Sequence, residues 1–332
     1  MNKYKDCYKL KGFVDIHIHG AVGQDVVTSG PNGLQKMAES LARHGVVGFL
    51  PTIPASSVEE TIFSLESMKK VMEEKSFNGA KIIGAHLEGP FMKEAYKGAL
   101  DYTKFASASV EYWEKLVGEY ENIVRRVTVD PLQDGVLDFI PYLVSKSISV
   151  TIGHTAADAE TVNKAIELGA DSITHIFNAM PPMHHRNPGP VGAALSNRKC
   201  KCELILDFLH VSPIAAKVVI EAKGPENVAI VTDSCEAAGM PDGDYELGGR
   251  LVHVRNGEAR LPEGNLASST VFMDQELRNV IELGYSIENA ETMLAKTPAS
   301  LVSYEHDEDY VIVDKDLNVV EVIISGKTVY RV

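Results

Sequence analysis

The sequence predicts an α/β fold, a (β/α)₈ TIM-type barrel with a reduced small β appendage. Three observations predict it. Eight short runs rich in valine and isoleucine alternate with longer helical patterns, polar residues gather where these runs end, and the tail alternates like antiparallel strands. A doubly wound open sheet is the alternative, but no G-x-G-x-x-G motif follows any of the runs.

The eight strand-like runs follow one another in the order that βα units require. They are GFVDIHIH (12–19), VVGFLPT (46–52), KIIGAHLEG (81–89), IVRRVTV (123–129), SISVTIGH (147–154), DSITHIFN (171–178), CELILDFLH (202–210) and VAIVTD (228–233). Amphipathic segments such as LQKMAESLARHG separate them, and several of these segments end in glycine, a common helix stop. Eight such units favour a closed parallel barrel.

Two long insertions interrupt the alternation, at residues 89–122 and 234–270. Loops of this length are usually binding or lid elements, and the second contains alternating runs typical of a hairpin. The tail, DYVIVDKDLNVVEVIISGKTVYRV, alternates like two or three antiparallel strands. We therefore expect a barrel over residues 12–305 and a small β appendage formed by residues 1–11 and 306–332.

Composition and charge exclude several classes of protein. The 332 residues carry a net charge of −14 with scattered lysines and arginines, which argues against nucleic acid or an anionic membrane as partner. No apolar run approaches the ~20 residues of a membrane span, and the first residues lack the apolar core of a signal peptide. The four cysteines form no disulfide framework. We expect free thiols and a cytoplasmic location.

Histidines and carboxylates recur where the strand-like runs end. His17 and His19 share one face of the first run, and two neutral imidazoles on one face make half a metal site. A single buried histidine is more often a hydrogen-bonded core residue. That explanation weakens here because six of the eight runs finish with such a residue, at the rim where barrel chemistry occurs. The residues are His17, His19, His86, Glu88, His154, His175, His210 and Asp233.

These residue types suit a divalent cation, Zn²⁺ or Fe²⁺, with one or two ions bridged by a carboxylate. A metal held by three or four such ligands keeps a position open for water and lowers the pKa of that water to about 7. The sequence therefore predicts hydrolysis. The candidate ligands are His17, His19, Glu88, His154, His175 and Asp233.

Together these motifs resemble the amidohydrolase superfamily and, more closely, its N-acetylglucosamine-6-phosphate deacetylase family. The matching stretches are GFVDIHIHG, HLEGPF, VTIGHT, THIFNAMPPMHHRNPGPVGAAL, HVSP, VTDSCEAAGMPDGDYELGG and NLASST. The resemblance implies an enzyme of amino sugar metabolism that hydrolyses the N-acetyl group of an amino-sugar phosphate. The expected reaction converts N-acetylglucosamine 6-phosphate to glucosamine 6-phosphate and acetate.

The resemblance also implies roles for individual residues. Glu88, His154 and His175 would hold the main metal, and His17 and His19 would complete a second position. Asp233 resembles the general base, which takes a proton from water and delivers it to the leaving amine, a step typically worth ~10²–10⁴ in rate. His210 resembles the residue that contacts the sugar near the scissile amide.

Further residues resemble the family's substrate pocket. Asn178 and Ala179 correspond to the segment that meets the phosphate, and Leu266, in NLASST, is expected beside the substrate. Arg186 resembles an arginine that reaches the neighbouring subunit's phosphate pocket, which implies a homodimer. From the residues alone, Arg186 is by default a solvated loop residue, and Asn178 could equally brace its own loop.

Three positions depart from the family pattern. Leu100 stands where a histidine that polarises the amide carbonyl is usual, and losing one such donor typically costs ~10²–10³ in kcat. Phe208 and Ser268 stand where smaller residues are usual, so we expect an altered sugar pocket. Two alternatives stay open: a related amidohydrolase acting on another amide or modified sugar phosphate, and a catalytically silent sugar-phosphate binder.

Overall fold

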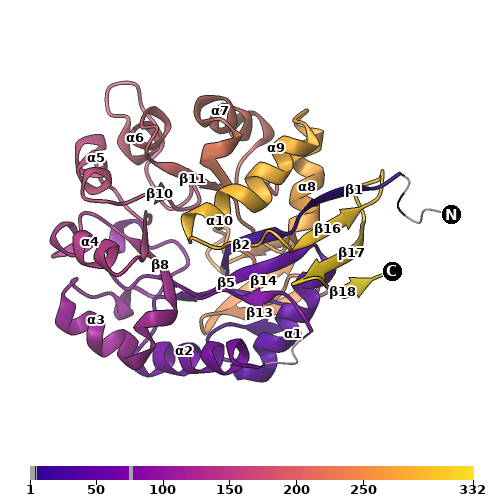
Figure 1. Ribbon diagram of the computed structural model, residues 1–332. Coiled ribbons are helices and arrows are strands. Elements are labelled where there is room, and N and C mark those ends of the chain that lie inside the picture. Colours follow the sequence, from indigo (N-terminus) through magenta and orange to yellow (C-terminus); the bar gives the residue numbers. More distant parts are fainter. Residues whose placement is uncertain (1–3, 5, 75–77) are drawn as a thin grey trace.

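The computed structural model describes residues 4, 6–74 and 78–332, and it confirms the predicted barrel (Figure 1). Neighbouring strands are parallel and follow the chain order. The strands are β2 (Phe13–Ile18), β5 (Val46–Pro54), β7 (Ala85–Glu88), β8 (Val124–Val129), β9 (Ser149–Ile152), β10 (Ser172–Ile173), β11 (Lys201–Leu204) and β12 (Val228–Ile230), with β6 (Lys81–Ile82) also paired to β5.

The barrel closes between β12 and β2 through residues that lie just beyond β12. Within the described ranges, the two strands themselves share no ladder pair. Instead the Asp233 N–H donates to the His17 carbonyl at 2.8 Å, and the His19 N–H donates to the Ser234 carbonyl at 2.8 Å. This seam therefore closes at the end of the barrel where the candidate site residues lie.

Helices surround the barrel in Figure 1, and their starting residues explain where they begin. Ser57, Ser109, Asp158 and Ser212 each accept a hydrogen bond from a backbone N–H of the first turn. The helices are α1 (Gly30–Arg43), α2 (Val58–Met72), α3 (Val110–Val117), α4 (Val136–Ser145), α5 (Ala159–Glu167), α6 (Gly189–Ser196), α7 (Pro213–Lys223), α8 (Met273–Glu282), α9 (Ile287–Glu291) and α10 (Thr297–Leu301). Short 3₁₀ segments are η1 (Glu94–Tyr96), η2 (Tyr102–Lys104), η3 (Gly118–Ile123) and η4 (Pro225–Asn227), and η5 (Thr292–Lys296) is a π-helical segment.

Three smaller sheets complete the fold. The alternating tail forms three strands, which join an N-terminal strand at the side of the molecule where both termini lie (Figure 1). The strands of this sheet are β1 (Tyr8–Lys11), β16 (Tyr310–Val313), β17 (Val319–Ile324) and β18 (Lys327–Arg331). The second insertion forms β13 (Gly243–Leu247), β14 (Arg250–Arg255) and β15 (Glu258–Arg260), and β3 (Gly20–Ala21) pairs with β4 (Gln24–Asp25). Residues 1–3 and 5 of the expected appendage lie outside the described residues, and its division from the barrel stays a prediction.

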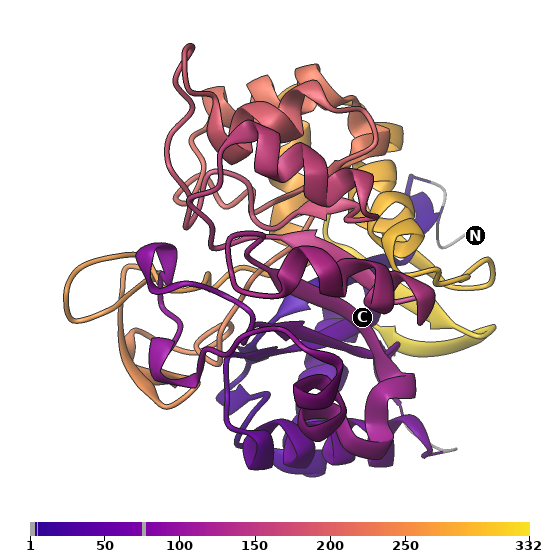
Figure 2. The same ribbon diagram turned by 90° about the vertical axis from the view of Figure 1, so that its left-hand side faces the viewer.

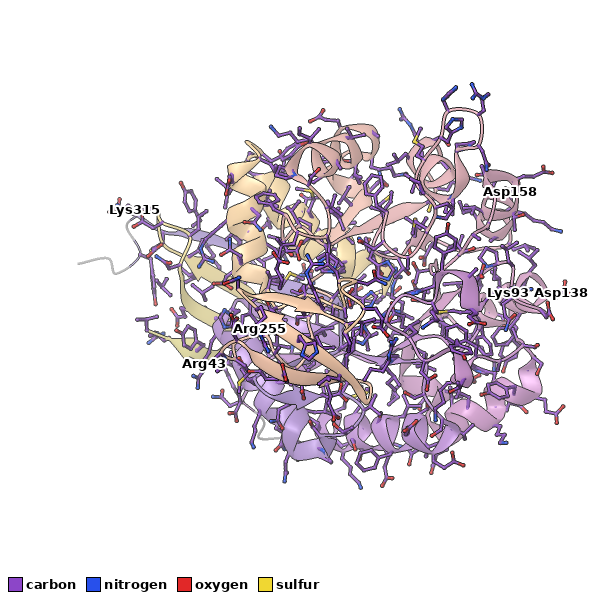
Figure 3. All side chains as sticks on the ribbon, turned by 180° about the vertical axis from the view of Figure 1, so that it is seen from behind. Arg43, Lys93, Asp138, Asp158, Arg255 and Lys315 are labelled. Carbon is purple, nitrogen blue, oxygen red and sulfur yellow. The ribbon has the colours of Figure 1, made fainter. Side chains whose placement is uncertain are left out.

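The two long insertions meet at one end of the barrel. They lie side by side at the left of Figure 2, and the Arg250 Nη1 donates to the Ala99 carbonyl at 2.7 Å. Ala99 also packs against the apolar cluster of the second insertion. In Figure 3 the sheet that carries Arg255 lies across the front of the barrel, and Lys315, in the turn between β16 and β17, marks the small C-terminal sheet at the left edge. The two insertions thus form a wall around one open end of the barrel.

The strands end earlier than the sequence indicates. β10 ends at Ile173 and β11 at Leu204. The prediction that His210 ends a strand is therefore wrong. It lies in a turn beyond β11, because the Asp207 carboxylate accepts the backbone N–H groups of Leu209 at 2.9 Å and of His210 at 2.8 Å.

Among the described residues, no helix combines the length and apolar character needed to cross a lipid bilayer.

Candidate active site

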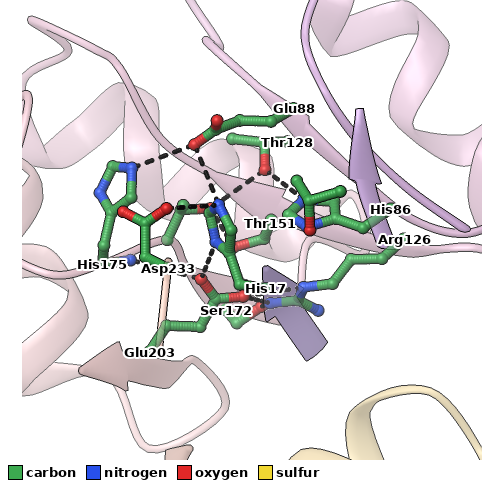
Figure 4. A network of polar contacts seen from close by, with 12 residues as sticks. His17, His86, Glu88, Arg126, Thr128, Thr151, Ser172, His175, Glu203 and Asp233 are labelled. Atoms are coloured by element: carbon green, nitrogen blue, oxygen red, sulfur yellow. Dashed lines mark hydrogen bonds and ion pairs between the residues drawn. The ribbon is translucent and has the colours of Figure 1, made fainter. Parts of the chain in front are cut away.

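Histidines and a glutamate from distant parts of the chain converge at the walled mouth of the barrel. Their potential ligand atoms form two groups, His17 with His19 and Glu88, and Glu88 with His154 and His175; within each group the atoms lie within 4.8 Å of one another. All five side chains are buried. Glu88, the last residue of β7, belongs to both groups and therefore lies between them (Figure 4).

The group around His154 has the composition of a cation site. The Nε2 atoms of His154 and His175 lie 3.1 and 3.2 Å from Glu88 Oε1, and 3.1 Å from each other. Each of these three atoms, two ring nitrogens and a carboxylate oxygen, can accept a hydrogen bond. Too few protons lie between them for every lone pair to be paired with a donor. A divalent cation satisfies such a group, since neutral imidazole and carboxylate are ordinary ligands of Zn²⁺ and Fe²⁺.

The group around His17 includes Asp233 as well. His17 Nε2 lies 3.3 Å from Glu88 Oε1 and 3.5 Å from Asp233 Oδ1. His19 Nε2 lies 3.2 Å from Glu88 Oε2 and 3.2 Å from Asp233 Oδ1. His17 Nε2 is buried without a hydrogen-bond partner. Buried polar atoms in native structures are nearly always paired, so this atom also indicates a cation position.

The electrostatics of the cluster favour added positive charge. Burial lowers the pKa of His19, but Asp233 and Glu88 bonded to its ring outweigh burial and raise the pKa to about 9. Burial likewise raises the pKa of Asp233, while His17 and His19 hold it below its ordinary value. The residues present therefore fit a divalent cation.

Three of these residues have an unusual backbone conformation. φ is 49° at His154, 27° at His175 and 48° at Asp233, a region that residues other than glycine rarely adopt. Such conformations cost about 1–3 kcal/mol each and cluster at functional sites. Each of these residues lies just beyond a strand, and the left-handed step turns its side chain toward the cluster. Gly98 faces His154 closely, because a Cβ there would lie 3.3 Å from His154 Cε1.

The second ring nitrogens of two histidines are held by backbone carbonyls. His19 Nδ1 lies 3.1 Å from the Thr52 carbonyl, and His154 Nδ1 lies 3.0 Å from the Tyr96 carbonyl. A carbonyl only accepts, so each Nδ1 must carry the proton. In the neutral ring, the form that binds a cation, Nε2 then carries the lone pair that faces Glu88.

His86, expected with the other strand-end histidines, does not reach the cluster. Its Nδ1 lies 3.2 Å from Thr52 Oγ1 and its Nε2 lies 2.7 Å from Thr128 Oγ1. Its ring packs edge-on against the His17 ring, with centroids 4.7 Å apart. His86 is thus a hydrogen-bonded core histidine that supports His17.

Sequence reasoning missed a buried ion pair behind the cluster. Arg126 and Glu203 lie on β8 and β11, with Arg126 Nη2 2.6 Å from Glu203 Oε1. The other oxygen, Oε2, lies 3.1 Å from His17 Nδ1. A carboxylate or arginine inside an apolar strand gives no sequence signal of its own.

A cavity of about 380 Å³ opens over the cluster. The cluster residues that line it are His19, Glu88, His154, His175 and Asp233, and the expected substrate-binding residues that line it are Asn178, Ala179, His210 and Leu266. Leu100 and Ser268 also line the cavity, but Phe208 is not among the lining residues. Sequence reasoning missed Tyr96 and Arg250, which lie in the insertions without a recognisable motif, and Asn265, the first residue of the NLASST stretch.

The pocket residues are held by local bonds. Asp207 Oδ2 lies 2.7 Å from His210 Nδ1. Burial lowers the pKa of His210, but this bond and charge raise it above its ordinary value. Asn178 Nδ2 donates to the His175 carbonyl at 3.2 Å, so it braces its own loop as well as lining the cavity.

Arg186 lies apart from the other candidate residues. Its loop is exposed, its guanidinium contacts His185 at 2.8 Å, and it does not line the cavity of its own chain. A single chain therefore does not bring Arg186 to the cluster.

Similarity to known proteins extends over nearly the whole chain. No family model matches it. The N-acetylglucosamine-6-phosphate deacetylase of Bacillus subtilis (strain 168) is 35% identical over 337 aligned residues, covering 98% of this chain and 85% of the relative. The N-acetylgalactosamine-6-phosphate deacetylase of Escherichia coli O157:H7 is 32% identical over 327 residues, covering 95% and 86%. The crystal structure of N-acetylglucosamine-6-phosphate deacetylase from Thermotoga maritima aligns with a TM-score of 0.91 at 32% identity, covering 98% of this chain and 89% of that one.

Proposed function

Because this chain belongs to the N-acetylglucosamine-6-phosphate deacetylase family of amidohydrolases, we propose that it hydrolyses the acetamide of N-acetylglucosamine 6-phosphate. The products are glucosamine 6-phosphate and acetate. One observation carries the proposal: the imidazoles and carboxylates form the floor of a single cavity of about 380 Å³, large enough for a sugar phosphate. Hydrolysis of a different amide is not favoured, because the relatives that match nearly the full chain are named as amino-sugar phosphate deacetylases.

We propose that Glu88, His154 and His175 hold one Zn²⁺ or Fe²⁺ ion and that His17 and His19 provide a second position with Glu88 and Asp233. The converging lone pairs and the unpartnered His17 Nε2 support this. A divalent ion there polarises the amide carbonyl and lowers the pKa of water.

In this proposal Asp233 is the general base. Its carboxylate lines the cavity and is held by His17 and His19, which keep its pKa low, so that it is ionised at neutral pH. It takes a proton from the attacking water as the water oxygen bonds to the carbonyl carbon. It then gives that proton to the amide nitrogen as the C–N bond breaks, which releases acetate and the amine.

His210 contacts the sugar near the scissile bond. Its Nδ1 is bonded to Asp207, which fixes the ring and leaves Nε2 for the substrate. Asn178, Ala179 and Leu266 line the same cavity and contact the rest of the sugar phosphate.

We propose a homodimer in which Arg186 of each chain reaches the phosphate of its neighbour. A planar guanidinium matches the paired oxygens of a phosphate. Two features support a subunit contact near its loop: Met183 is 55% exposed, and α7, beside α6 in Figure 1, exposes Ile214 (79%) and Val218 (52%). Apolar groups of this kind are typical of interfaces.

Two further proposals concern location and organisation. We propose a cytoplasmic enzyme, supported by four free cysteines of the kind found in reducing compartments. We also propose that residues 12–305 form the hydrolase unit and that residues 1–11 and 306–332 form a small β appendage, supported by the separate sheet of β1, β16, β17 and β18.

Acetate release from purified, ion-loaded protein tests the function. We expect turnover of N-acetylglucosamine 6-phosphate and much weaker turnover of unphosphorylated N-acetylglucosamine. The galactosamine epimer belongs in the same assay, because the Escherichia coli relative is named for it. No acetate from either phosphate would overturn the proposal, and equal turnover with and without phosphate would remove the role given to Arg186.

A further inference from the structure

We propose that Glu203, held by Arg126, is the positioning residue that makes His17 a cation ligand (Figure 4). The inference rests on the proposed function and deepens it, since it identifies what builds the second cation position. Nothing in the chemistry of acetamide hydrolysis requires Glu203 itself, which lies beneath the cluster and does not line the cavity.

Arg126 fixes the orientation of the Glu203 carboxylate. Its Nε and Nη2 donate to Glu203 Oε1 at 2.8 and 2.6 Å, which uses that oxygen. Nη2 also donates to Ser172 Oγ at 2.7 Å, and Nη1 donates to Ser149 Oγ. Because the guanidinium is held on three sides, the carboxylate cannot rotate without losing both bonds.

The other carboxylate oxygen determines which nitrogen of His17 carries the proton. Glu203 Oε2 lies 3.1 Å from His17 Nδ1 and accepts the His175 N–H at 3.4 Å. As the ion-pair partner of an arginine, this carboxylate only accepts, so His17 Nδ1 must donate. In the neutral ring that can bind a cation, Nε2 then carries the lone pair, and it lies 3.3 Å from Glu88 Oε1 and 3.5 Å from Asp233 Oδ1. Three acceptors around one point form a cation position.

Stability alone does not account for the ion pair. Arg126, Glu203 and His17 are all 0% exposed, and a buried ion pair is generally no more stable than an apolar pair of similar volume. A carboxylate bonded to the far nitrogen of a ligating histidine does fix its tautomer, and losing such a partner typically costs ~10–100-fold in metal affinity.

Glu203→Gln tests the tautomer directly. Arg126 offers only donors, so the new amide must turn its oxygen to Arg126 and its NH₂ to His17 Nδ1. His17 then has to carry its proton on Nε2, where it blocks the cation. We expect one ion per subunit to bind ~10–100-fold more weakly. Chelator competition with Zn²⁺ measures the affinity, and ¹H–¹⁵N spectra of histidine-labelled protein report the His17 tautomer.

A second variant and a control separate positioning from folding. Arg126→Met with Glu203→Leu removes both charges together, which buried sites tolerate well. It should fold, yet show the same loss of Zn²⁺ affinity and of the Nδ1–H tautomer. Glu276→Gln is the matched control: Glu276, on α8, is another fully buried carboxyl, bonded to the Leu206 N–H at 3.2 Å, and it belongs to neither group of ligand atoms. It should leave both readouts unchanged.

The outcomes separate this inference from the proposed function. Wild-type protein that binds Zn²⁺ and releases acetate, with both Glu203 variants equal to it in affinity and tautomer, would overturn only the role of Glu203. The same holds if Glu276→Gln lowers the affinity as much as the Glu203 variants. Wild-type protein that neither binds Zn²⁺ nor releases acetate would overturn the proposed function.

Discussion

Asp233 lines the cavity beside His19, with its Oδ1 3.2 Å from His19 Nε2. We expect Asp233→Asn to lower kcat for acetate release by ~10²–10⁴, because the amide cannot take a proton from water. The exposed carboxylate Asp244 on β13 gives a matched control, and Asp244→Asn should retain wild-type turnover. Unchanged kcat in Asp233→Asn would assign the base to another residue.

Arg186 gives a different kind of prediction, because it does not line the cavity of its own chain and is proposed to contact the phosphate bound by the neighbouring subunit. Arg186→Ala should raise KM for N-acetylglucosamine 6-phosphate about 10–100-fold, the loss of one charged hydrogen bond. Turnover of the unphosphorylated sugar should not change. Arg255→Ala, which removes an exposed arginine at the end of β14, is the control. Equal KM values for Arg186→Ala and wild type would show that the phosphate is bound without this loop.

At the scale of single residues, the sequence predicted the cluster of histidines and carboxylates. It did not predict the buried ion pair that holds His17 in place. His17 and His19 were predictable because alternate strand positions share a face, and Glu88 because parallel strand ends meet at one mouth. Glu203 and Arg126 were not predictable, because two strands separate β8 from β11 in the sheet and no periodicity tells which inward residues face each other across a barrel. Phe208, whose backbone has φ 63° in the turn that Asp207 holds, does not line the cavity, and no pattern in the sequence indicates that turn.

Among the elements, β17 carries the clearest pH-dependent contact. Glu321 accepts bonds from Thr328 Oγ1 at 2.6 Å and Arg331 Nε at 2.9 Å. Burial raises its pKa, but these bonds prevail and lower it to about 2, from 4.5. Its stabilisation is therefore complete above pH ~4.5 and is lost as the pH falls toward 2.

Thermal melts of wild type and Glu321→Gln test this contact. At neutral pH we expect the variant to melt roughly 1–3 °C lower. The gap should close as the pH falls through this window, because wild-type Glu321 becomes protonated. A gap that is constant with pH would mean that the carboxylate charge contributes nothing to the sheet.

The sequence predicted where the strands lie but not where they end, and this difference has one physical cause. The eight apolar runs were visible because buried parallel strands are continuously rich in valine and isoleucine. Their ends were not, because His175 and Asp233 leave the strands through left-handed backbone steps that tertiary contacts impose. The extra strand of the second insertion, β15, is held by pairing with β14 rather than by a pattern of its own.

A cation bound at the cluster should contribute to the stability of the whole molecule. The candidate ligands come from β2 and β7 and from residues just beyond β9, β10 and β12, so a cation bound there would link most of the barrel wall. An ion present at ~1,000 times its Kd stabilises the native state by about 4 kcal/mol. Chelation should therefore lower Tm by roughly 5–15 °C, and added Zn²⁺ should restore it. A Tm that does not respond to chelation would argue against a resident ion.

The site lies at the seam between β12 and β2, so ion binding should also affect how firmly the barrel closes there. His19 stands on one side of that join and Asp233 on the other, and the backbone bonds across it lie at the same level. An ion bound between His19 and Asp233 should therefore also hold the seam between β12 and β2 closed. Deuterium uptake by the amides of residues 13–19 and 228–234 should quicken when the ion is stripped, while α3 and α4, on the opposite wall, exchange as before.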